Sequence, residues 1–271
     1  MAHMVNAGKQ NVLGIQISVV DYAAATAKIV EMARLRRPMA VSALAVHGLM
    51  SGVLDPELKF RLNRFDLLCP DGQPVRWAVN WLNSTRLSDR VYGPFLTLHV
   101  CEAAASEGLS IFLFGSSAEV LAKLETNLTA RFPKLRIAGK QPSRFRKATS
   151  DEVAKDVETI RASGASIVLA GLGCPRQEIW AFEMREALGV PILAVGAAFD
   201  FHAGSLPMAP PSMQKLGLEW LFRLWHEPAR LWRRYLYLNP LYVGGVLLQV
   251  IGLKQFDPDI ARQPEEPLRF G

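Results

Sequence analysis

The sequence predicts an α/β fold: a mostly parallel, Rossmann-like sheet with helices covering both faces. Between residue 12 and about residue 200, short apolar runs alternate with longer segments in which apolar residues recur every three or four positions. The short runs are almost continuously apolar, which is typical of parallel strands buried on both faces. The longer segments have the spacing of amphipathic helices, which supply the crossover connections that parallel strands need.

Six apolar runs are expected to form strands. They cover residues 40–46, 66–70, 110–115, 135–139, 166–173 and 191–199. The clearest helical patterns between them cover residues 118–132 and 150–162. No internal repeat or low-complexity stretch interrupts this alternation, so residues 12–211 are predicted to form one core domain.

A change in composition follows the proline-rich stretch "GSLPMAPPSM" at residues 204–213, which marks an edge of the core. Residues 212–256 are predicted to form a helical appendage rich in Arg and Trp that completes a site and faces a membrane. Its helices are expected over 212–226 and 228–238, and Pro228 suits the first turn of the second one.

The two ends of the chain are expected to be loose. Residues 1–11 open with "MAHM", a Met ahead of a second Met, and are interpreted as a disordered N-terminus or the remnant of a tag. Residues 257–271, "DPDIARQPEEPLRFG", are rich in proline and charge and are interpreted as a flexible tail.

The composition limits the compartment and the class of partner. Half of the 271 residues are hydrophobic, so the chain can bury a sizeable core, and the net charge of +6 favours an anionic partner. Three widely spaced cysteines without a CxxC pair exclude a disulfide framework and a zinc ribbon. The longest apolar run, 241–253, is too short to cross about 30 Å of hydrocarbon as a helix. Because the N-terminus also lacks a signal-peptide layout, we expect a cytoplasmic protein of bacterial type that can touch a membrane.

Loops at the carboxyl ends of the predicted strands are the first place to seek a ligand site. Four of them are "PDGQP" (70–74), "FGSSAEV" (114–120), "GLGCPRQE" (171–178) and "GAAFDFHAG" (196–204). The second and third, with Gly115 and Gly173, resemble phosphate cradles ahead of a helix. Neither completes a dinucleotide or P-loop motif, and each glycine alone also suits an ordinary turn. Together with the carboxylates of the first and fourth loops, they favour a nucleotide-like ligand.

Each candidate side chain also has a purely structural interpretation. Asp71 stands in "PDG", which forms ordinary type I turns. Asp200 follows an apolar run and precedes aromatic residues, an unusual place for a carboxylate that binds nothing. His47 and His202 are isolated histidines, and Cys174 lacks the His and Asn pattern of a cysteine nucleophile.

The stretch "LWHEPARLWRRYLYL" at residues 224–238 mixes arginines with tryptophans. A solvated helical face with snorkelling arginine stems is the simplest interpretation, but it has little use for the tryptophans. Arg, Trp and Tyr together are typical of a membrane interface. Nucleic acid also binds such side chains, but the chain carries no recognition motif, so no nucleic-acid partner is expected.

Six stretches carry a resemblance to a known family. They are "DLLCPDGQPVRWA" (66–78), "RVYGPFL" (90–96), "IFLFGSS" (111–117), "GLGCPRQEIW" (171–180), "VGAAFDFHAG" (195–204) and "GLEWLFRLWHEPARLWRRYL" (217–236). In this order and spacing the sequence resembles the WecG/TagA/CpsF glycosyltransferases, bacterial enzymes that extend lipid-linked sugars during surface polysaccharide synthesis. The resemblance covers roughly residues 12–245.

The resemblance implies an inverting transfer of a hexose or N-acetylhexosamine from a UDP-sugar to a saccharide on polyprenyl (undecaprenyl) pyrophosphate. The enzyme would sit peripherally on the inner leaflet of the plasma membrane and use no cofactor. The "DPD" at 257–259 matches a metal-binding DxD but lies in the tail, so no metal site is expected.

The resemblance also implies roles for residues of this chain. Asp71 falls on the family's general base, and an inverting transfer needs such a base because the acceptor hydroxyl loses its proton as it attacks. The expected donor contacts are Gly115, Gly173, Gln177 and Asp200, the last to uracil or ribose. The arginines expected to close over the diphosphate are Arg223, Arg230 and Arg233.

Departures from the family pattern leave the donor sugar open. The family commonly has Thr-x-Asn where this chain has Ala43 and Ala45, Arg where it has Met208, and Asp where it has Phe95. The loss of polar groups makes a plain hexose such as glucose as good an expectation as N-acetylmannosamine. His47 lies close to the altered stretch and is expected to take over a sugar contact.

Two rival interpretations account for parts of the sequence. An inactive accessory subunit of a transferase pair would keep the fold and the membrane-facing appendage without turnover. A nucleotide-binding oxidoreductase would share the sheet, but the incomplete glycine motifs and the arginine-rich appendage argue against it. The acceptor sugar, the linkage and the choice between a monomer and a homo-oligomer stay open.

Overall fold

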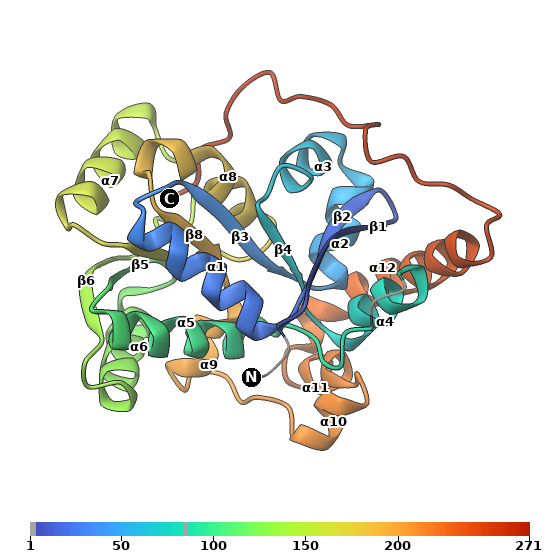
Figure 1. The fold of residues 1–271 in the computed structure, drawn as a ribbon, viewed down its shortest axis with the longest axis horizontal. Helices are drawn as coiled ribbons and strands as arrows, with labels where there is room; N and C mark the ends of the chain where they lie inside the picture. Colours follow the sequence, from blue (N-terminus) through green and yellow to red (C-terminus); the bar gives the residue numbers. More distant parts are fainter. Residues whose placement is uncertain (1–3, 84–85) are drawn as a thin grey trace.

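A six-stranded parallel sheet forms the centre of the computed structural model, which describes residues 4–83 and 86–271 (Figure 1). The strand order is β4-β3-β8-β7-β5-β6, and every neighbouring pair is parallel. The strands are β3 (Met39–Leu44), β4 (Leu67–Pro70), β5 (Ser110–Gly115), β6 (Arg136–Gln141), β7 (Ile167–Gly171) and β8 (Pro191–Ala194). All six predicted strands are confirmed, although the last is shorter than expected because the chain turns at Gly196 into a helix.

Helices cover both faces of this sheet, as the continuous apolar runs predicted. One face packs against α1 (Tyr22–Arg34), α5 (Gly93–Glu107), α6 (Ala118–Arg131) and α9 (Ala197–His202). The other packs against α2 (Val46–Leu54), α3 (Pro56–Leu62), α7 (Ser150–Ala162) and α8 (Arg176–Leu188). Strand β5 shows the division: Ile111 and Leu113 enter the first cluster, whereas Phe112 and Phe114 enter the second. The predicted fold class is therefore confirmed.

The N-terminal residues form a hairpin where the sequence predicted disorder. Strands β1 (Asn6–Val12) and β2 (Ile15–Val20) pair antiparallel. Leu13 and Gly14 form the connecting turn, and both have the positive φ (54° and 86°) of a type I′ turn. The expectation of a disordered segment 1–11 is wrong from Asn6 onward, because a buried β2 holds β1 in place; residues 1–3 lie outside the described residues.

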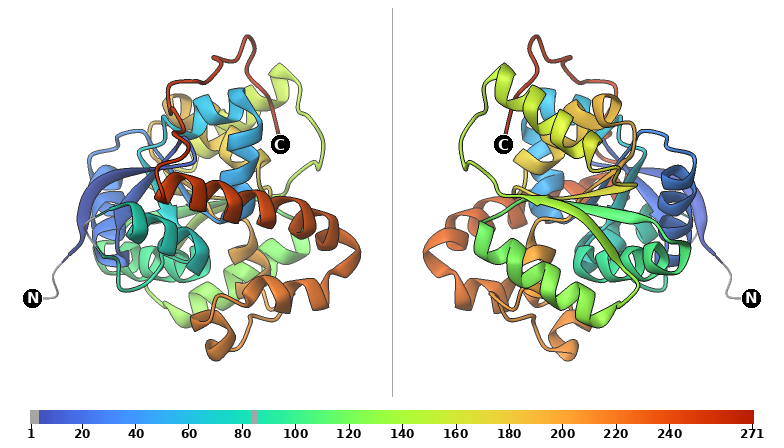
Figure 2. Two further views of the ribbon diagram at one scale, coloured as in Figure 1. Left: turned by 90° about the vertical axis from the view of Figure 1, so that its right-hand side faces the viewer. Right: turned by 90° about the vertical axis from the view of Figure 1, so that its left-hand side faces the viewer.

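The C-terminal helices differ in their limits from the predicted ones. The expected helix over 212–226 is split into α10 (Pro211–Lys215) and α11 (Glu219–His226) by Gly217, whose φ is +71°. The expected helix over 228–238 continues as α12 (Pro228–Val250), and with α4 (Gln73–Leu82) it closes one side of the molecule (Figure 2). Within the described part of the chain, no helix is both long and apolar enough to cross a membrane.

Residues 257–271 have almost no regular structure, but they are tied to the core at several points. This segment, red in Figures 1 and 2, leaves α12, passes α3 and ends beside the loop between β6 and α7. Phe270 forms an antiparallel bridge with Lys147 of that loop. The structure thus differs from the free tail that the sequence predicted.

Candidate active site

A cavity of about 920 Å³ lies along the carboxyl ends of the strands. The loops after all six strands of the sheet contribute to its lining, and α11 and α12 form the facing wall. In strand order, one lining residue from each loop is Asp71, Ala45, Gly196, Gly173, Ser116 and Phe145. The sequence predicted a ligand site at this edge, where parallel sheets place their ligands.

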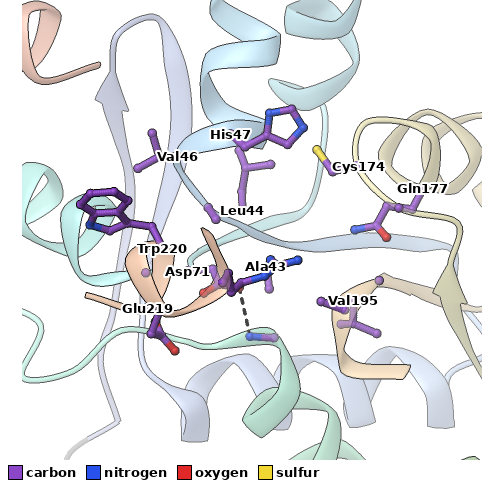
Figure 3. Close-up of a pocket in the computed structure, with 18 of the residues that line it drawn as sticks. Ala43, Leu44, Val46, His47, Asp71, Cys174, Gln177, Val195, Glu219 and Trp220 are labelled. Carbon is purple, nitrogen blue, oxygen red and sulfur yellow. Dashed lines mark hydrogen bonds between the residues drawn. The ribbon is translucent and has the colours of Figure 1, made fainter. Parts of the chain in front are cut away.

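Asp71 follows β4 directly and is held at the N-terminus of α5. Its Oδ2 accepts a hydrogen bond from the backbone N–H of Gly93 at 3.3 Å, the dashed line in Figure 3. A Cβ at Gly93 would lie 3.2 Å from the Cβ of Ala43, a tight contact, and 3.5 Å from that Oδ2, so a side chain has little room at this position. Burial raises the pKa of Asp71 to about 6, against the opposing effects of Arg90, the Gly93 N–H and Arg223. The carboxylate is thus ionised at neutral pH and more basic than a surface aspartate.

Three arginines line the opposite wall of the cavity: Arg223 of α11 and Arg230 and Arg234 of α12. Glu227, between the two helices, accepts from Arg223 Nη2 at 3.3 Å and from Arg230 Nη1 at 2.5 Å. One carboxylate therefore positions two guanidinium groups and leaves a net positive wall, which suits a phosphate or diphosphate group.

The expectation for Arg233 is not met by the structure. Its side chain does not line the cavity, and its guanidinium lies 5.2 Å from the ring centroid of Trp232. Arg234 lies four residues after Arg230 and lines the cavity instead. Spacings of three and four are both compatible with one helical face, so the sequence could not choose between these two arginines.

The two glycine loops have different roles. Gly115 (φ +105°) does not line the cavity; a Cβ there would lie 2.7 Å from the backbone of Gly171, so this glycine allows β5 and β7 to approach. The cavity wall at this strand consists of Ser116 and Ser117, and Ser117 also caps α6 by accepting from Val120 N at 3.2 Å. Gly173 does line the cavity, ahead of α8, as expected.

Gln177 lines the cavity as expected, and its neighbour Glu178, which sequence reasoning missed, orients it. The Nε2 of Gln177 donates to Glu178 Oε1 at 2.9 Å, and the Ser42 hydroxyl donates to the same oxygen at 3.0 Å. Glu178 is 1% exposed, and burial raises its pKa. The sequence did offer a signal for Glu178, because a carboxylate directly before the apolar residues Ile179 and Trp180 is unusual in a segment that enters the core.

His47 and Asp200 both line the cavity. His47 stands in the first turn of α2, beside the sulfur of Cys174 (Figure 3), and burial together with Arg234 lowers its pKa to about 4. A neutral imidazole offers one donor and one acceptor, which suits a sugar hydroxyl. Burial raises the pKa of Asp200, and Arg230 opposes this shift. His202 has the structural role that its isolation indicated, since its Nε2 bonds the carbonyl of Pro94 at 2.8 Å.

A buried ion pair that the sequence did not reveal attaches α11 to the core. Arg90 is 3% exposed, and its guanidinium forms a two-pronged contact with the carboxylate of Glu219, with Nη2 to Oε1 at 2.8 Å. The same Nη2 donates to Gln214 Oε1 at 3.2 Å. Glu219 itself lines the cavity (Figure 3), so this pair fixes the arginine-bearing wall relative to Asp71.

A comparison with protein families identifies the family of this chain. The family described as the glycosyl transferase WecG/TagA/CpsF family matches residues 10–256 of the 271. The chain belongs to the WecG/TagA/CpsF family. As a member of this family it is a glycosyltransferase of cell-surface glycan synthesis, and the resemblance seen in the sequence is confirmed. The match covers the sheet, the cavity and α12, whereas residues 257–271 lie outside it.

Proposed function

We propose that this WecG/TagA/CpsF family member is an inverting glycosyltransferase. It would move a hexose or N-acetylhexosamine from a UDP-sugar to a saccharide on polyprenyl pyrophosphate, in exopolysaccharide or other surface glycan synthesis. The observation that supports this most is the pairing, in one cavity, of a basic carboxylate at Asp71 with the guanidinium groups of Arg223, Arg230 and Arg234.

The chemistry of an inverting transfer matches these groups. The acceptor hydroxyl attacks the anomeric carbon from the side opposite the leaving group, and Asp71 takes the hydroxyl proton as the new C–O bond forms. The bond between the anomeric carbon and the oxygen of the β-phosphate breaks, and UDP leaves with that oxygen and the electron pair. Arg223, Arg230 and Arg234 are placed to stabilise the charge that grows on the departing diphosphate.

The outer surface of α11 and α12 supports a peripheral position on the inner leaflet of the membrane. Large apolar side chains on these helices are exposed, and Trp225 is 84% exposed. Other exposed side chains of this surface are Leu221, Trp232, Leu236, Tyr237, Leu241, Leu247 and Leu248. Such a surface would bring the cavity mouth close to an acceptor that is anchored in lipid.

The cavity wall around Ala43 and Ala45 bears on the donor sugar. Both methyl groups line the cavity where many family members are expected to present polar side chains, and neutral His47 lies next to them. Fewer hydrogen bonds at this wall favour a plain hexose such as glucose at least as much as N-acetylmannosamine.

The test is acceptor-dependent release of UDP from a panel of UDP-sugars, with a synthetic polyprenyl-pyrophosphoryl saccharide as acceptor. We expect release with one donor, unchanged by EDTA, because arginines supply the charge that a bound metal supplies in other transferases. Release with no donor, from a folded protein that still binds UDP, would contradict the proposal and favour the accessory-subunit reading. Loss of activity in EDTA would show that a metal takes part in stabilising the leaving group.

A further inference from the structure

Residues 257–271 follow a fixed path over the surface, and backbone carbonyls of this segment serve as anchors. The Nζ of Lys59 donates to Asp257 O at 2.6 Å, and the Nδ2 of Asn63 donates to Pro258 O at 3.0 Å. Further along, the backbone N–H of Arg262 donates to Pro56 O at 3.1 Å. These contacts tie the segment to α3 on its way to the loop between β6 and α7 (Figures 1 and 2).

The end of the segment holds the β6–α7 loop by its backbone. The carbonyl of Gly271 accepts from Arg144 N at 2.8 Å and from the Ser143 hydroxyl at 2.9 Å. Arg269 O accepts from Ala148 N at 3.2 Å. The loop is also fixed from the other side, because both terminal nitrogens of Arg144 donate at 2.7 Å to the buried carboxylate of Asp156 in α7.

Phe145 stands in the middle of this loop in a conformation that needs support. Its φ is +55°, in the left-handed region that a phenylalanine rarely adopts, and its side chain is 62% exposed although it lines the cavity. Its N–H donates at 2.9 Å to the same Ser143 hydroxyl that donates to Gly271 O. The Ser143 N–H in turn donates to Ser116 O at 2.9 Å, so the segment end, Phe145 and a cavity wall residue meet at one serine.

We propose that residues 257–271 act as a strap that holds Phe145 at the cavity mouth as a stacking face for the base of the nucleotide donor. The inference rests on the proposed function. Asp71 follows β4 at one edge of the sheet and Phe145 follows β6 at the other, so a donor whose sugar lies at Asp71 has its base toward Phe145. An exposed aromatic ring held rigidly beside a polar loop is what a planar base needs for stacking.

Calorimetric titration of the full chain with UDP and with inorganic pyrophosphate separates the base from the phosphates. Phe145→Ala is expected to weaken UDP binding about tenfold and to leave pyrophosphate binding unchanged, while Phe145→Trp keeps UDP binding. Arg230→Ala is the matched control, because it should weaken the binding of both UDP and pyrophosphate. A chain that ends after residue 265 should reproduce the Phe145→Ala pattern, whereas Ile260→Ala, an exposed residue of the strap, should behave like the wild type.

The outcomes distinguish this inference from the proposed function. Wild-type protein that binds no UDP contradicts the proposed function itself. If UDP binds to the wild type and Phe145→Ala binds it equally well, the stacking face is wrong. If Phe145→Ala weakens UDP binding but the shortened chain, checked for an unchanged melting temperature, does not, the strap is wrong. Equal weakening of UDP and pyrophosphate in Phe145→Ala means a general loss of the cavity and also overturns the inference.

Discussion

Asp71 combines burial at the end of β4 with a hydrogen bond from the N-terminus of α5. If it is the base, Asp71→Asn should reduce turnover by a factor on the order of 10² to 10⁴ and leave UDP affinity within about twofold. In the wild type, activity should fall as the pH drops through about 6, where this carboxylate takes up a proton. Steady-state UDP release across pH, together with calorimetric UDP binding, checks both points. An active Asn variant would remove Asp71 from the mechanism.

Asp71→Asn should lower activity, but it should raise the stability of the folded protein at neutral pH. The pKa of Asp71 is raised to about 6 from its ordinary 3.8, so between these values the folded protein binds more protons than the unfolded chain. The free energy of unfolding therefore decreases as pH rises through that window, by about 1–3 kcal/mol. Urea denaturation should show Asp71→Asn to be more stable than the wild type at pH 7.5 and nearly equal to it at pH 4.

Individual residues differed in how far the sequence could place them. Asp71, Gln177 and Asp200 stand in segments that follow strands, and strand ends meet at one edge of a parallel sheet, so their position at the cavity could be predicted. Arg234 was not selected because Arg233 and Arg234 are adjacent on a helix, and only tertiary packing decides which of them faces the cavity. Glu178 was missed because its partner Ser42 lies 136 positions away in the chain, and only the fold brings the two together.

Helix α12 shows how packing overrides a local stop signal. Pro240 lies inside the helix and removes one backbone donor, yet the helix continues to Val250. Leu238, Tyr242 and Val246 recur every four residues and enter the hydrophobic core, and the Tyr242 hydroxyl donates to Pro74 O at 2.9 Å. The second half of α12 thus packs into the core.

A matched pair of leucines on α12 tests this assignment. Leu238→Ala removes a buried side chain and should lower the free energy of unfolding by about 2–4 kcal/mol. Leu236→Ala, at a position that is 69% exposed on the same helix, should change it by less than about 0.5 kcal/mol. Chemical denaturation of both variants gives the comparison, and equal stabilities would mean that this half of α12 does not hold the core together.

Elements were predicted best where burial dominates the sequence pattern. Strands β3, β4, β5, β7 and β8 are almost fully buried and α7 is strongly periodic, and the structure has them close to the expected residues. Strand β1 was missed because most of its side chains are exposed and polar, so it carries no hydrophobic pattern of its own. Its order comes from pairing with β2, which a reading of local segments does not reveal.

At the scale of the whole molecule, the exposed surface of α11 and α12 should bind lipid. Co-sedimentation with vesicles that contain anionic lipid is expected for the wild type. The double substitution Trp225→Ser with Trp232→Ser should reduce the bound fraction on the order of tenfold. Leu35→Ser, an exposed apolar residue at the end of α1, is the control and should leave binding unchanged. Equal binding by all three proteins would contradict a role of this surface.

Net charge and the pattern of apolar runs are sums over many residues, so they could be read from the sequence. The net charge predicted an anionic partner, and the apolar runs predicted a sheet covered on both faces. The relation of the arginine-bearing helices to the core could not be predicted. It depends on contacts between distant residues, such as Arg90 with Glu219, 129 positions apart in the chain, and Pro74 with Tyr242. No local pattern couples such distant residues.

Because the ion pair of Arg90 and Glu219 is buried, salt should affect membrane binding far more than it affects the attachment of α11 to the core. Ionic strength screens exposed charges over a Debye length of about 8–10 Å, whereas a pair enclosed by protein is screened far less. If α11 and α12 lie on anionic lipid, salt would detach the enzyme from the membrane and leave Arg90 and Glu219 joined. The released enzyme would keep its arginines over the cavity, ready for a soluble acceptor.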